Sequence, residues 1–184
     1  MKKYHLKKLF LLTICCSLIM TSCMTNKFEN DPLETVESLD LEQYLGRWYE
    51  IARYQKSFEK NLYGVTAEYS LRDDGQIQVL NSGFKYSLDG KYKSAKAVAW
   101  RPDDSVPGAL KVKFFGLFTG DYLVFGLDDN YQWALVGDNS RSSLWFLSRT
   151  PTISDEVLEQ MKSIAIDQGY DLSKLFFVDQ KARE

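Results

Sequence analysis

Apolar and polar residues alternate along much of the chain between residues 46 and 148. A period of two is typical of a β-strand that buries one face. The clearest example is residues 65–71, where Val, Ala, Tyr and Leu occupy one face and Thr, Glu and Ser the other. An Arg-Asp-Asp-Gly turn follows at 72–75, and the alternation resumes at 76–81. The sequence therefore predicts a β-hairpin here.

Further segments have strand-like patterns and are joined by short connections. They are residues 46–53, 92–100, 110–114, 122–127, 132–137 and 143–148. Eight antiparallel strands in chain order favour a closed up-and-down barrel of a size that holds one small ligand. A β-sandwich is the alternative. The last three segments are apolar on both faces, so we expect another element to cover their outer side.

A helical pattern follows the strands. Ser154 suits an N-cap, and apolar residues at helical spacing predict one face that packs on the outside of the barrel. These apolar residues are Val157, Leu158, Met161, Ile164 and Ala165. Gly169 predicts the end of this C-terminal α-helix. We expect residues 171–179 to return as a short extra strand, and residues 41–45 to form one helical turn before the first strand.

The N-terminus has the pattern of a targeting segment. Four lysines precede an apolar run that is too short to span a bilayer. The run ends at Met-Thr-Ser-Cys, which resembles a bacterial lipobox, so residues 1–22 are predicted to be a lipoprotein signal peptide and Cys23 the lipid-attachment site. An ordinary secretory signal with an incidental cysteine is the alternative. Residues 23–38 are predicted to be the lipidated N-terminus and tether, and residues 39–184 one domain.

Composition and charge narrow the function classes. Without the four lysines of residues 1–22, 19 basic residues face 25 acidic ones, which gives a net charge near −6. No basic stripe suits nucleic acid. The single histidine, His5, lies in the predicted signal peptide, so we expect no His-based catalysis, no metal site and no cofactor. Loss of Cys15 and Cys16 and acylation of Cys23 would leave the domain without a disulfide.

Three short motifs resemble those of the lipocalin family. They are Gly46-x-Trp48 on the first strand, residues 127–131 between the sixth and seventh strands, and Leu-Ser-Arg at 147–149. The resemblance covers residues 39–180 and is strongest to lipid-anchored bacterial members. It implies an all-β calyx, an eight-stranded antiparallel up-and-down barrel with one C-terminal α-helix on its outside. The middle motif departs from the usual Thr-Asp-Tyr, which blurs any receptor-recognition role of the loops at that end.

The resemblance also implies how the barrel is closed. Trp48 would plug one end and Arg149 would pack across it, with Gly46 two residues before the tryptophan. The alternation along the strands then places Glu50 and Ala52 on the inner side with Trp48. The remaining predicted lining is Val65, Ala67, Tyr69, Ile77, Val79, Asn81, Ala95, Ala97, Leu110, Val112, Phe114, Trp145 and Leu147. Several of these residues are small, which argues for a cavity rather than a solid core.

We therefore predict a membrane-anchored protein that binds a fatty acid, a lysophospholipid or a similar hydrophobic ligand. The predicted ligand-binding residues are Trp145, Tyr69, Phe114, Val112, Leu147, Ala67, Val79, Ala97 and Glu50. Lipid storage, transport or scavenging in the bacterial outer membrane, facing the periplasm, is the implied role, with a homodimer as one possible state. Residues 114–121 are unusually aromatic and would contact lipid, a second molecule or the barrel rim. A lipocalin-fold enzyme and a partner-binding module are the competing classes.

Overall fold

The computed structural model describes residues 31–114 and 116–180, without the side chain of Phe58. The strands in these residues are β1 (Gly46–Tyr54), β2 (Leu62–Leu71), β3 (Ile77–Lys85), β4 (Lys91–Trp100), β5 (Ala109–Phe114), β6 (Phe118–Leu127), β7 (Trp133–Gly137), β8 (Leu144–Ser148) and β9 (Leu175–Phe177). The helices are α1 (Leu41–Tyr44) and α2 (Asp155–Asp167), with 3-10 turns η1 (Ser57–Glu59) and η2 (Leu172–Lys174). The predicted signal peptide and Cys23 lie outside the described residues.

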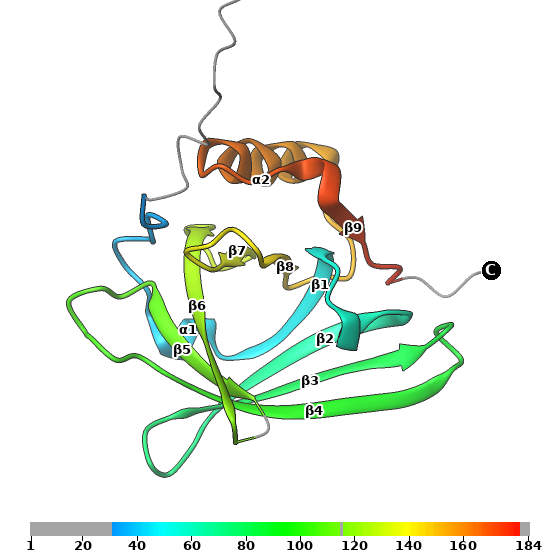
Figure 1. The fold of residues 1–184 in the computed structure, drawn as a ribbon, viewed down its shortest axis with the longest axis horizontal. Helices are drawn as coiled ribbons and strands as arrows, with labels where there is room; N and C mark the ends of the chain where they lie inside the picture. The colour runs from blue at the N-terminus through cyan, green and yellow to red at the C-terminus, as the bar shows by residue number, and fades with distance from the viewer. Residues whose placement is uncertain (1–30, 115, 181–184) are drawn as a thin grey trace, which may run out of the picture.

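Strands β1 to β8 form a closed antiparallel barrel (Figure 1). Each strand pairs with its sequence neighbour, and β1 pairs with both β8 and β2, which closes the ring. This closure confirms the predicted barrel and excludes the sandwich. Strands β3 and β6 are longer than their predicted segments, because Ser82 to Lys85 and Phe118 to Asp121 also pair with neighbouring strands.

Helix α2 covers the outer side of the last barrel strands, as predicted (Figure 1). The Ser154 hydroxyl accepts a hydrogen bond from the Val157 amide at 3.3 Å and caps the helix. Met161 is completely buried against a cluster that includes Leu135 and Phe146. A helix that buries one apolar stripe is stabilised mainly by such packing. The outer apolar face of β7 and β8 is thus buried against α2, while their inner face lines the barrel.

The prediction that Ala52 faces the interior is wrong. A bulge between Glu50 and Ala52 shifts the β1–β8 register, so that Glu50 lies opposite Leu147 but Ala52 lies opposite Phe146. Ala52 belongs to the outer cluster under α2. Because a one-residue slip moves every following side chain to the other face, Arg53 takes the inner position opposite Trp145.

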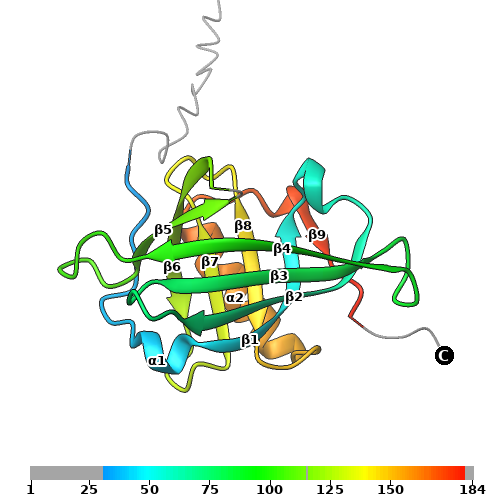
Figure 2. The same ribbon diagram turned by 90° about the horizontal axis from the view of Figure 1, so that it is seen from below.

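The connections alternate between the two ends of the barrel (Figure 2). One end carries the turns at 72–76, 101–108 and 128–132, together with α1, and we call it the floor. The other end, here called the mouth, carries residues 55–61, 86–90 and 138–143 and the β5–β6 connection. Residues 31–38, predicted to be part of a tether, pack against the barrel, where Leu33 is buried and the Val36 amide donates to the Val124 carbonyl at 2.9 Å.

Candidate ligand site in the barrel

The floor is built around Trp48, which is completely buried. Its indole Nε1 donates to the Tyr44 carbonyl at 2.8 Å, which satisfies the one polar group of the ring. The Arg149 guanidinium carbon lies 3.8 Å from the centre of the Trp48 ring, an arrangement that favours a cation–π interaction. Gly46, at φ +89°, carries the chain past this pair, since a positive φ costs glycine little.

Arg149 also ties the floor together through main-chain carbonyls. Its guanidinium donates to the carbonyls of Gln43 (2.6 Å), Leu45 (2.9 Å), Arg47 (3.0 Å) and Tyr131 (3.2 Å). These oxygens belong to α1, the entrance of β1 and the β6–β7 turn, so one side chain joins three separate segments. The arrangement is structural, and it seals this end of the barrel.

A layer of tyrosines lies directly inside the floor. The Tyr122 hydroxyl is 2.8 Å from the hydroxyls of both Tyr44 and Tyr69. Burial raises the pKa of all three phenols above the ordinary value, so they stay neutral and bond one another. Tyr69, predicted to line a cavity, is therefore part of this layer. Tyr44 and Tyr122 were missed, although Tyr122 shares the inner face of β6 with Val124 in the strand pattern.

The middle of the barrel is apolar and rich in small residues. The predicted lining residues Ala67, Val79, Ala97, Val112 and Leu147 belong to one buried cluster with Trp48 and Tyr69. Phe114 and Trp145 are partly buried and pack against the same cluster. Whether any of these side chains contacts a ligand remains a prediction.

The inner face becomes exposed toward the mouth. On β4, Ala97 is 2% exposed, whereas Lys93, four residues nearer the mouth on the same face, is exposed. On β6, Val124 is fully buried and Phe118 is 69% exposed. Burial therefore decreases along the inner face from the floor to the mouth, where β4 continues beyond its pairing with β5 at Ala97 to Trp100.

Gly120 shows the open space most directly. It lies opposite Val112 in the β5–β6 ladder, so its missing side chain would point to the inner face. A Cβ atom built at Gly120 meets no heavy atom of the described residues within 4 Å. Unoccupied space therefore adjoins the inner face of β6 near the mouth.

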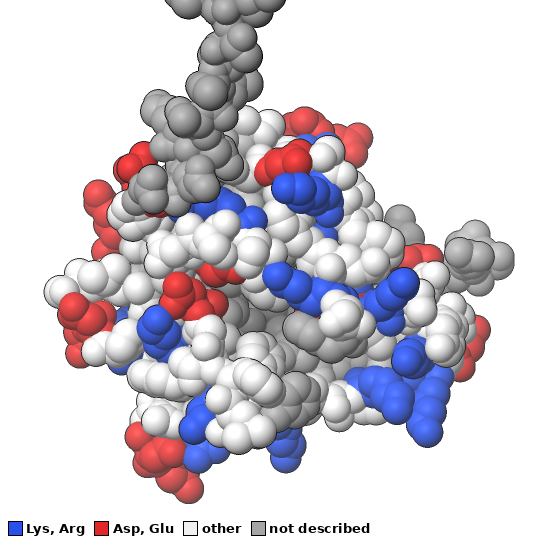
Figure 3. Space-filling view, viewed as in Figure 1, with Lys and Arg blue, Asp and Glu red and all other residues white. Residues whose placement is uncertain are grey.

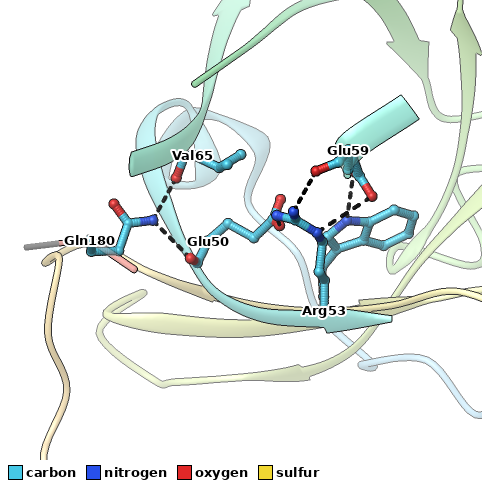
Figure 4. A network of polar contacts seen from close by, with 6 residues as sticks. Glu50, Arg53, Glu59, Val65 and Gln180 are labelled. Atoms are coloured by element: carbon cyan, nitrogen blue, oxygen red, sulfur yellow. Dashed lines mark hydrogen bonds and ion pairs between the residues drawn. The ribbon is translucent and has the colours of Figure 1, made fainter. Parts of the chain in front are cut away.

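A buried ionic cluster lies at the mouth end of β1 (Figure 4). Arg53 is fully buried and forms a short ion pair with Glu50. Its Nη2 donates to the Glu59 carbonyl at 2.8 Å, and its Nε lies 3.8 Å from Glu59 Oε2. Trp145 Nε1 approaches Glu59 Oε1 at 3.4 Å. Arg53 and Glu59 were not predicted as interior residues, because neither the β-bulge nor the path of the η1 turn can be recognised in the sequence.

The carboxyl groups of Glu50 and Glu59 share the single guanidinium of Arg53, and this shared partner affects their pKa values. Burial raises the pKa of Glu50 to about 7 even though Arg53 opposes the shift. Burial also raises the pKa of Glu59. Desolvation penalises the charged form of a carboxyl group, and a single cation compensates only part of that cost for two acids. Both carboxyl groups therefore lose their protons at a higher pH than free carboxyl groups do.

The C-terminal segment closes the seam between β1 and β2 on the mouth side. These two strands pair directly only from Gly46 to Tyr49 on β1. Farther along, Gln180 Nε2 donates to the carbonyls of both Glu50 and Val65 at 2.8 Å each (Figure 4). β9 pairs with the end of β1, which confirms the predicted extra strand and holds Gln180 in place.

Metal sites, membrane-spanning helices and surface hollows are the other features of the described chain that bear on function. Residues 31–114 and 116–180 contain no group of three or more His, Cys, Asp and Glu side chains that could hold a metal ion. No helix within these residues is long and apolar enough to cross a membrane. Hollows of about 320 and 310 Å³ lie outside the barrel, one between α2 and the β6–β7 turn and one over β3 to β5.

A barrel sealed by a tryptophan at one end and open at the other defines a protein class that binds a small ligand inside a calyx. The sequence matches the lipocalin-like domain over residues 39–180. This chain belongs to the lipocalin family, whose members are generally binding proteins rather than enzymes.

Similar proteins include bacterial, animal and plant lipocalins. The outer membrane lipoprotein Blc of Vibrio cholerae is 40% identical over 169 residues, 91% of this chain and 96% of the relative. The Escherichia coli K12 protein of the same name is 47% identical over 145 residues, 79% of this chain and 81% of the relative. Apolipoprotein D of Mus musculus is 35% identical over 78% of each chain. Among solved structures, insecticyanin of Manduca sexta superposes with a TM-score of 0.63 at 21% identity, over 80% of this chain and 84% of that structure.

Proposed function

We propose that this protein is a lipid-anchored lipocalin of the bacterial outer membrane that holds one fatty acid, lysophospholipid or similar amphiphile in its barrel. The carrying observation is the exposed inner face of β6, where a Cβ at Gly120 would meet no described atom within 4 Å. The outer membrane assignment and the lipid anchor at Cys23 rest on the similarity to the Blc lipoproteins and on the lipobox-like sequence.

The distribution of polarity along the barrel fits an amphiphile that enters tail first. The acyl tail would enter among Ala67, Ala97, Val112 and Leu147, which are apolar residues of the buried interior cluster. At about 25 cal/mol per Å² of apolar area removed from water, the tail would supply most of the affinity. The polar head would remain at the level of Trp145 and the ionic cluster, where charged groups are available. Storage, transport or scavenging of membrane lipid follows from such a site.

The direct test is titration of delipidated mature protein with fatty acids and lysophospholipids, followed by tryptophan fluorescence and calorimetry. We expect saturable binding near one ligand per barrel. Ala97→Leu places extra bulk on the inner face of β4 and should weaken binding at least tenfold. Ser94→Leu is the matched control, because residue 94 is exposed and lies on the outer face of the same strand.

A second variant tests the wall nearest the mouth. Trp145→Ala removes the indole that packs against the interior cluster and should weaken binding severalfold, with the greatest effect on long tails. Absence of binding for every amphiphile tested would refute the proposal. Equal affinity in wild type and Ala97→Leu would show that the ligand binds elsewhere.

A further inference from the structure

Large apolar side chains are exposed around the mouth. Leu117 is 78% exposed, Phe118 69%, Tyr86 68% and Tyr92 52%. They belong to the β5–β6 and β3–β4 hairpins, whose ends lie at the same end of the barrel. Large apolar side chains exposed at one end of a barrel are costly in water and can mark an interaction surface. We call these four residues the rim.

The charge around the rim is opposite in sign to that of the protein. The β3–β4 hairpin carries Lys85, Lys91 and Lys93 against one acid, Asp89, and Figure 3 shows basic side chains gathered where this hairpin ends. Lys56 and Lys60 lie in the β1–β2 connection at the same end. The floor turns, in contrast, contain six aspartates and two arginines. Lysines flanking apolar tips are suited to an anionic lipid surface.

The start of the described chain lies at the mouth as well. The Asp31 carbonyl accepts a hydrogen bond from Arg141 at 2.5 Å, and the Leu33 amide donates to the Asn139 side chain at 2.9 Å. Asn139 and Arg141 belong to the β7–β8 connection. Seven residues separate Cys23 from Asp31, and the eight Cα–Cα steps between them span at most about 28 Å. Because the described chain begins at the mouth, an acyl anchor on Cys23 favours the mouth as the end next to its membrane.

We infer that the rim docks on the anionic surface of the membrane that holds the N-terminal lipid, so that the barrel opens directly onto the bilayer. The inference rests on the lipid anchor of the proposed function and adds an orientation and a partner surface to it. The apolar tips would enter the interfacial region, and the lysines would lie at the level of the phosphates. A ligand could then pass between bilayer and barrel without crossing water.

Spin labels on acylated mature protein test this orientation. The predicted mature chain has no cysteine except Cys23, so Leu117→Cys and Leu71→Cys each accept one label. Leu71 is the matched control, because it is 61% exposed but lies at the floor end of β2. The protein is reconstituted in vesicles of phosphatidylethanolamine and phosphatidylglycerol. Accessibility of each label to a lipid-soluble and to an aqueous relaxation agent is then measured.

We expect the label at position 117 to be several times more accessible to the lipid-soluble agent, and the label at 71 to remain aqueous. Lys85→Glu combined with Lys91→Glu and Lys93→Glu should reduce this preference on the anionic vesicles. Aqueous accessibility at both positions would overturn the inference. Dipolar coupling between labels at position 117 would also overturn it, since a second copy would then cover the rim.

Two measurements on the same samples separate this outcome from failure of the proposed function. Mass spectrometry of the N-terminal peptide reports acylation of Cys23. Titration of the detergent-solubilised variants with a lysophospholipid reports binding in the barrel. Normal acylation and ligand binding with an aqueous label at 117 would refute the orientation alone, whereas lost ligand binding with a lipid-exposed label would refute only the binding function.

Discussion

Replacement of Arg149 by alanine tests the construction of the floor. The substitution removes a guanidinium stacked 3.8 Å above the Trp48 ring and four hydrogen bonds to main-chain carbonyls. Because Arg149 is only partly buried, we count each hydrogen bond at about 0.5 kcal/mol, the low end of the usual range. The cation–π contact adds about 1 kcal/mol. The free energy of unfolding should fall by about 3 kcal/mol, which corresponds to a decrease of about 10 °C in the melting temperature of a domain of this size.

Urea denaturation followed by tryptophan fluorescence measures this change. Arg149→Lys retains the charge but loses the planar stacking and most of the donors, so it should lose about 2 kcal/mol. Arg72→Ala is the control, because Arg72 is exposed and its ion pair at the floor end joins only Asp74, which should contribute less than about 1 kcal/mol. A loss below about 1 kcal/mol for Arg149→Ala, near the level of the control, would refute the reasoning that this side chain holds the floor together.

Two further predictions concern the mouth half of the barrel. Glu50, whose pKa is raised to about 7, stabilises the fold most at low pH, and its contribution is lost as the pH rises from the unfolded value near 4.5 through 7. Relative to Glu50→Gln, the urea midpoint of wild type should therefore fall between pH 5 and 8, and parallel curves would contradict the shift. Gln180→Ala removes both bridges across the β1–β2 seam and should cost about 1 kcal/mol. The same substitution should speed hydrogen exchange of the Gly64 amide, which donates to the Asp179 carbonyl. Gln78→Ala is the control, because Gln78 also donates to two carbonyls but lies on the outer face. It should leave the exchange of the Gly64 amide unchanged.

The strand pattern predicted the barrel well because each strand buries one face against a single interior. The same periodicity placed Ala67, Val79, Ala97 and Val112 on that interior. The apolar outer faces of the last strands correctly called for a covering element, which is α2. Local chemistry was equally informative at Ser154, where the cap depends only on residues three positions apart.

The ionic cluster could not be predicted from the alternation of apolar and polar residues. Strict alternation from Trp48 places Ala52 inside, but the bulge after Glu50 exchanges it for Arg53. A bulge is selected by the fit of β1 against β8 and β9, and these strands lie far away in the sequence. Glu59 reaches Arg53 because the η1 turn in the β1–β2 connection brings it back to the end of β1. Neither event leaves a periodic signal in the sequence.

The all-β barrel, its single outer helix and the small-residue interior could be predicted from the sequence, because these features follow from local periodicity and side-chain size. Only the folded structure reveals the β1 bulge, the Gln180 bridge across the seam and the position of the rim residues at the end where Asp31 lies. Those features depend on strand register and on contacts between residues more than 100 positions apart. Such contacts are fixed only when the closed barrel brings distant segments together.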